Sequence, residues 1–78
     1  MSYTNTLVQK VYSLLEPLIG ASMAAAALTV QFKRLGIAED TLGIKDLPAL
    51  AAGIEKGLIV FLGSDSARGI SQSIAQIA

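Results

Sequence analysis

The sequence predicts an all-α protein, a small bundle of about four short helices within a single domain, residues 1–78. Apolar residues recur at helical three- and four-residue spacing almost throughout, and Gly, Pro and Ser separate these runs. A chain of 78 residues can fill only one core. It buries only about 60% of its unfolded surface, and it has neither Cys nor His to supply a disulfide or a common metal ligand. We therefore expect oligomerisation to complete the bundle.

The first expected helix covers residues 5–16. Thr4 or Asn5 can cap its start. Pro17 lacks a backbone N–H and disfavours helical backbone at Glu16, so the helix is expected to end or kink there. Its apolar face consists of Leu7, Val8, Val11, Tyr12, Leu15 and Leu18.

The second expected helix begins near residues 20–22 and ends at Gly36. Lys33 and Arg34 fall in its last turn, where the helix dipole favours cations, and Gly36 is the residue type that ends helices. The helix carries two apolar stripes, one of Met23, Ala26, Ala27 and Val30 and the other of Ala24, Leu28, Phe32 and Leu35. Two stripes predict burial on most sides, and the sequence leaves open which of them faces the core.

The third expected helix follows a connection over residues 37–45 in which residues 39–42 form a short helical turn. Asp46 can cap the third helix, and Pro48 suits its first turn. Its apolar stripe consists of Leu47, Leu50, Ala51, Ile54, Leu58, Phe61 and Leu62. Gly53 and Gly57 each cost about 1 kcal/mol in a helix interior relative to Ala, and this predicts close backbone approach by a neighbouring helix.

The fourth expected helix begins after Gly63, which ends the third. The residues that can cap it are Ser64, Asp65 and Ser66. Its apolar face consists of Ala67, Ile70, Ile74 and Ile77. The sequence shows no evident internal repeat.

Charge and composition argue against several classes of function. The six basic residues balance the six acidic ones and are scattered, whereas binding to a phosphate backbone needs clustered cations; nucleic acid is therefore not expected as a partner. Residues 17–32 carry no charge but fall short of the roughly 20 residues that span a membrane, so spanning is not expected either. No secretory signal follows Met1, which favours a cytoplasmic location, and the starting Met favours a complete protein.

No catalytic residue, cofactor or metal ligand is expected, because no His or Cys can act as a base or nucleophile. The carboxylates at helix ends are explained by capping. One weak anion-site candidate stands at the start of the fourth helix, where free backbone amides can attract phosphate. It comprises Gly63, Ser64, Ser66 and Arg68. Asp65 would repel an anion there, so an ordinary helix cap is the preferred interpretation.

A mean hydropathy of +0.58 is high for a small water-soluble monomer, and such an apolar surplus needs to be covered by something. The leading hypothesis is a non-enzymatic interaction or regulatory module that self-associates as a homodimer or larger oligomer, or docks on another helical protein. The expected interface residues are Met23, Ala27, Val30, Phe32, Ile59 and Val60. The alternative is an apolar-ligand or lipid-contacting protein with a pocket between the second and third helices.

Overall fold

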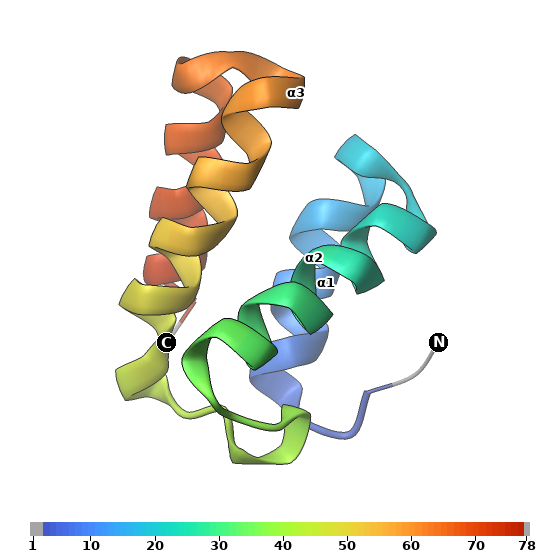
Figure 1. Cartoon of the computed structure of the whole chain (residues 1–78), viewed down its shortest axis with the longest axis vertical. Coiled ribbons are helices and arrows are strands. Elements are labelled where there is room, and N and C mark those ends of the chain that lie inside the picture. The colour runs from blue at the N-terminus through green and yellow to red at the C-terminus, as the bar shows by residue number, and fades with distance from the viewer. Residues whose placement is uncertain (1–2, 78) are drawn as a thin grey trace.

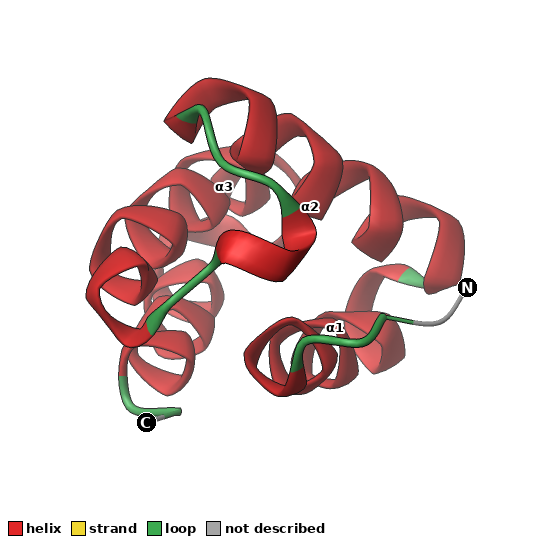
Figure 2. Cartoon of the chain, turned by 90° about the horizontal axis from the view of Figure 1, so that it is seen from below, coloured by secondary structure: helices red, strands yellow, loops and turns green. Residues whose placement is uncertain are grey.

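The computed structural model describes residues 3–77 and confirms the all-α fold class. It contains three α-helices, α1 (Thr6–Ile19), α2 (Ala21–Leu35) and α3 (Leu47–Ala75). Two short 3-10 turns, η1 (Glu39–Thr41) and η2 (Ile44–Asp46), lie between α2 and α3. The helices surround one core (Figures 1 and 2).

Helix α1 runs past the predicted end at Glu16 and stops at Ile19. Pro17 lies in the last turn, where its missing N–H costs only one backbone hydrogen bond. The backbone N–H of Gly20 then donates to the carbonyl of Glu16 at 2.8 Å. The expected end of the helix at residue 16 was therefore wrong.

Helix α2 ends as predicted at Gly36. This glycine has φ +69 in the left-handed region, where glycine is the favoured residue. Its N–H donates to the carbonyl of Lys33, and the N–H of Ile37 donates to that of Phe32 at 3.0 Å. These two bonds satisfy carbonyls that the helix end would otherwise leave free.

The predicted turn after α2 is present as η1, but the predicted cap of α3 is not formed. Asp46 makes no side-chain bond at the start of α3. Its Oδ2 instead accepts from the backbone N–H of Gly43 at 2.9 Å and so closes η2. Pro48 does lie in the first turn of α3, as expected.

The expected third and fourth helices belong to one element, α3, which Gly63 interrupts with φ +83 and ψ 164. The structure therefore has three α-helices rather than about four. We call residues 47–62 the first segment of α3 and residues 64–75 its second segment; Figure 1 shows that the second segment runs back beside the first. By length and composition alone, Ile44–Ala75 could cross a membrane, but the core helix of a soluble domain can pass the same test.

The structure contains an internal repeat that the sequence did not reveal. Gly20, between α1 and α2, has φ +86 and ψ 162, close to the angles of Gly63. The two glycines are 43 positions apart (63 less 20), and the α1–α2 corner and the corner within α3 lie at the same end of the molecule (Figure 1). Five buried residues of the first half have a buried counterpart 43 positions later in the chain. The pairs are Val8 with Ala51, Val11 with Ile54, Leu15 with Leu58, Ala24 with Ala67 and Gln31 with Ile74. The fold is therefore two similar helical hairpins packed together.

The core is formed by one face of every helical segment. On α2 the inward stripe is the one that carries Ala24 and Leu28, both fully buried. The other stripe, with Met23 and Val30, is exposed. The stripe of α2 that faces the core is therefore the one with Ala24 and Leu28, and the stripe with Met23 and Val30 lines a groove on the surface.

Candidate functional site

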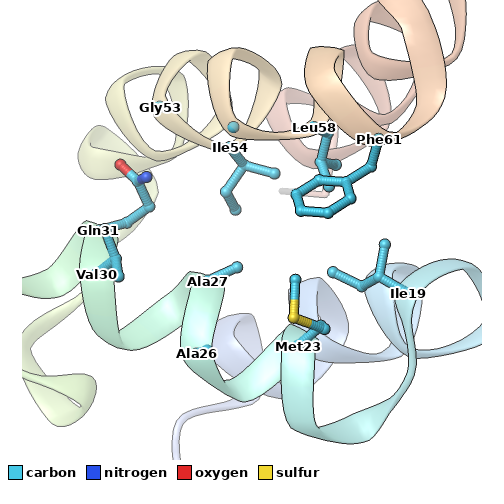
Figure 3. Close-up of a pocket in the computed structure, with 11 residues that line it drawn as sticks. Ile19, Met23, Ala26, Ala27, Val30, Gln31, Gly53, Ile54, Leu58 and Phe61 are labelled. Atoms are coloured by element: carbon cyan, nitrogen blue, oxygen red, sulfur yellow. The ribbon is translucent and has the colours of Figure 1, made fainter.

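An apolar groove of about 240 Å³ separates α2 from the first segment of α3. We call it the α2–α3 groove. Its walls are lined by Ile19, Met23, Ala26, Ala27, Val30, Gln31, Gly53, Ile54, Gly57, Leu58 and Phe61. Figure 3 shows side chains from both helices facing one another across it. None of the lining residues is titratable, and Gln31 is the one with a polar side chain.

The groove is tight at one glycine of α3 and roomy at the other. A Cβ added at Gly53 would overlap the side chains of Gln31 and Arg34, whereas one added at Gly57 would meet nothing within 4 Å. The predicted close approach of a neighbouring helix backbone is therefore found at neither glycine: Gly53 is approached by side chains of α2, and Gly57 faces open space. The groove is therefore closed at Gly53 and open at Gly57, one helical turn further along α3.

The polar group at the tight end is held by hydrogen bonds along the rim. Gln31 is only 8% exposed. Its Oε1 accepts from Nε of Arg34 at 2.8 Å. Nη2 of Arg34 donates to the carbonyl of Ala49, at the start of α3, at 3.1 Å. These bonds tie the last turns of α2 to the first turns of α3.

A second groove lies between α1 and the second segment of α3, and we call it the α1–α3 groove. It is lined by Leu14, Leu18, Leu62, Ser66, Gly69, Ile70 and Ser73. Under the 43-residue repeat, each of these residues corresponds to a residue that lines the α2–α3 groove. The repeat therefore produces two related grooves, of which the α1–α3 groove has serines where the α2–α3 groove has Met23 and Val30.

The structure brings together only some of the predicted interface residues. Met23, Ala27 and Val30 line the α2–α3 groove. Phe32 does not, because it packs against the core. Ile59 and Val60 are exposed on the first segment of α3, outside the groove lining.

The weak anion-site candidate lies at the corner within α3. Gly63, Ser64, Ser66 and Arg68 are all exposed there, and Ser66 also lines the α1–α3 groove.

The described titratable groups with a shifted pKa lie on α1 and before it, not in either groove. The rings of Tyr3 and Tyr12 pack at a tilt of 56°, with centroids 5.6 Å apart. Desolvation raises the pKa of both phenols, with Glu39 adding to the effect at Tyr3 and the hydrogen-bonded Glu16 at Tyr12. Within residues 3–77, no three or more of His, Cys, Asp and Glu are grouped to hold a metal ion.

Sequence reasoning missed Gln31, although one signal was available. Gln31 continues the inward stripe of α2 at helical spacing, following Ala24 and Leu28 and preceding Leu35. A polar residue within an apolar stripe is the informative case, since an amide needs a partner when it is buried. Its partner here is Arg34, three residues further along the same helix.

Comparison with known proteins gives no further guide to the role of these grooves: no family model matches the chain, and no curated protein or solved structure is significantly similar to it.

Proposed function

We propose that this chain is a small non-enzymatic binding module that holds an apolar ligand in the α2–α3 groove. The observation that carries the proposal is a concave surface with apolar walls from two helices, open at Gly57 and lacking titratable side chains. Small-molecule sites are typically concave and mostly apolar, with few polar groups. The lining offers no acid, base or nucleophile for catalysis, so binding is the function that its chemistry supports.

The groove can be filled selectively by mutation, because each of the two grooves has an unobstructed helical glycine in its lining. Gly57 lines the α2–α3 groove and Gly69 the α1–α3 groove, and a Cβ at either would meet nothing within 4 Å. Gly57→Leu introduces the residue found at its repeat counterpart, Leu14. Both Gly57→Leu and Gly69→Leu are expected to stabilise the protein by up to about 1 kcal/mol, since Leu is a much better helix former than Gly.

Only Gly57→Leu is expected to abolish ligand binding. The measurement is the rise in melting temperature produced by small apolar compounds, since a ligand that binds the folded state raises it. Native mass spectrometry of the purified protein would show whether a ligand accompanies it. Equal ligand-induced shifts in the two variants would place the site outside the α2–α3 groove.

We also propose self-association as a second function, because large apolar side chains outside the groove lining remain exposed. Val60 is 84% exposed and Ile59 lies beside it in the sequence. Scattered exposed apolar residues are ordinary, whereas neighbouring ones are typical of interaction surfaces. The zero formal net charge means that two copies carry no net repulsion.

Self-association is tested by light scattering with size-exclusion chromatography over a concentration series. Val60→Glu is expected to shift the protein towards monomer, because a charge would have to be buried in the interface. Ile44→Glu is the matched control, since Ile44 is also an exposed aliphatic residue, at 64%, but belongs to η2 rather than α3. A wild-type monomer at all concentrations would contradict this second proposal.

A further inference from the structure

The side-chain amide of Gln31 presents an unused hydrogen-bond donor to the α2–α3 groove. Its Oε1 is turned to Arg34, which fixes the orientation of the amide. Figure 3 shows Nε2 on the opposite side, towards Ile54 and the groove. No acceptor among the described residues pairs with this Nε2. No fully buried side-chain nitrogen or oxygen in residues 3–77 lacks a partner, so the unpaired Nε2 keeps some accessible surface.

An amide is not what packing alone requires at this place in the fold. The repeat counterpart of Gln31 is Ile74, which is fully buried. The same position in the other hairpin is thus filled by an aliphatic side chain. Because Nε2 keeps some accessible surface, water can pair with it, and the oxygen of a bound ligand would take the place of that water.

Gly53 leaves space for the acceptor end of this amide. A Cβ added at Gly53 would overlap Oε1 of Gln31 and the guanidinium of Arg34. Oε1 is thus held beside Gly53 by the Arg34 hydrogen bond, and this fixes the direction of Nε2. A donor held in this way is preorganised, and a ligand loses less entropy in pairing with it.

The size and lining of the groove restrict what could pair with Nε2. An apolar cavity of about 150 Å³ binds benzene, so a groove of about 240 Å³ suits a slightly larger molecule, of roughly eight non-hydrogen atoms. No cation lines the groove, and the nearby guanidinium of Arg34 already donates to Oε1 of Gln31 and to the carbonyl of Ala49, so an anionic head group in the groove would have no counter-charge of its own. A neutral molecule with a single oxygen acceptor and an apolar body satisfies both conditions.

We infer that the α2–α3 groove binds a neutral, carbonyl-bearing aliphatic molecule of about eight non-hydrogen atoms, whose oxygen accepts a hydrogen bond from Nε2 of Gln31. The carbonyl lies at the tight end, beside Gly53. The aliphatic chain extends past Gly57 towards Met23 and Phe61, which line the open end. This inference rests on the proposed ligand-binding function and names the ligand class for the same groove.

The test compares two compounds of equal size, 2-heptanone and 2-methyl-1-heptene. The second is a hydrocarbon that has a methylene group in place of the carbonyl oxygen of the first. Binding to the full chain is followed by NMR, including the side-chain amide resonances of Gln31. The ketone is expected to bind about three- to tenfold more tightly, the usual net effect of one hydrogen bond. It is also expected to shift the Gln31 amide resonances, which the hydrocarbon leaves close to their free positions.

Two variants separate the donor from the shape of the groove. Gln31→Leu removes the amide, and Gln31→Glu keeps its shape and its contact with Arg34 while replacing the donor by an oxygen. Both are expected to bind the ketone no more tightly than the hydrocarbon. The Glu variant preserves the test if the Leu variant folds poorly.

The outcomes distinguish this inference from the function on which it rests. Equal binding of both compounds to the wild type would overturn the role of Gln31 and leave the apolar groove as a binding site. Binding of neither compound would overturn both. A ketone preference that persists in Gln31→Glu would show that another group donates the hydrogen bond.

Discussion

Gly63→Ala is expected to lower the free energy of unfolding by about 1–3 kcal/mol, a large part of the roughly 4–12 kcal/mol available to a domain of this size. The cause is local. With φ +83 and ψ 164, Gly63 occupies a backbone region that is essentially restricted to glycine. No neighbour obstructs an added Cβ, since nothing lies within 4 Å of it. The expected loss therefore comes from the backbone conformation and not from a clash.

The substitution has a second consequence for α3, because Ala favours the helical conformation that Gly63 avoids. A helix continued through residue 63 would move the second segment away from the first. The faces that carry Ala67 and Ile74, both fully buried, would then lose their cover. Reduced stability in urea, measured by circular dichroism, is expected together with increased association in light scattering.

Gly20→Ala is the replicate in the other hairpin, since Gly20 has nearly the same backbone angles. A similar loss is expected there. Gly57→Ala is the control, because Gly57 lies within α3 with open space around it, and it should gain up to about 1 kcal/mol. If Gly63→Ala were as stable as Gly57→Ala, the corner would not need the observed backbone angles.

The sequence predicted the helical class and most helix boundaries because those depend on local signals. Gly36 ends α2 through its own backbone conformation, and Pro48 marks the start of α3 through the same kind of local preference. Prediction from the sequence fails where a side chain has two possible hydrogen-bond partners nearby. Asp46 had a carboxylate free to cap α3, yet it bonds to Gly43, and only the path of the chain before α3 decides between the two.

The repeat and the site could not be predicted because they depend on tertiary packing. The hairpins share buried positions but few residues, as the pairs Val8 with Ala51 and Gln31 with Ile74 illustrate. The burial of Gln31 depends on Gly53, a residue of a different helix. Periodicity along one helix cannot show which residue of another helix leaves space for it.

Asn5 ties the start of α1 to the connection between the hairpins, and this is the other position where a single substitution has a large expected effect. Its Oδ1 accepts from the N–H of Leu7 at 2.9 Å, the helix cap that the sequence predicted as one of two choices. Its Nδ2 donates to the carbonyls of Glu39 and Leu42, both at 3.0 Å. One amide thus satisfies a helix start and two carbonyls of the η1 region.

Asn5→Asp is expected to destabilise the protein by about 2–4 kcal/mol at neutral pH, although Asn and Asp are about equally good helix caps. The substitution keeps the cap acceptor and removes both donors, at about 1–3 kcal/mol for each group left without a partner. It also places a carboxylate near two carbonyl oxygens and the Glu39 side chain, whose Oε2 accepts from the backbone N–H of Asn5 at 2.9 Å. Urea unfolding of the variant and the wild type measures the difference.

A charge-matched control identifies the cause of that loss. Thr6→Asp is the control, because it adds the same charge one residue later, at the exposed first position of α1, where the helix dipole favours an anion. A loss in Asn5→Asp no greater than that in Thr6→Asp would mean that the two Nδ2 hydrogen bonds contribute nothing to holding the connection against α1.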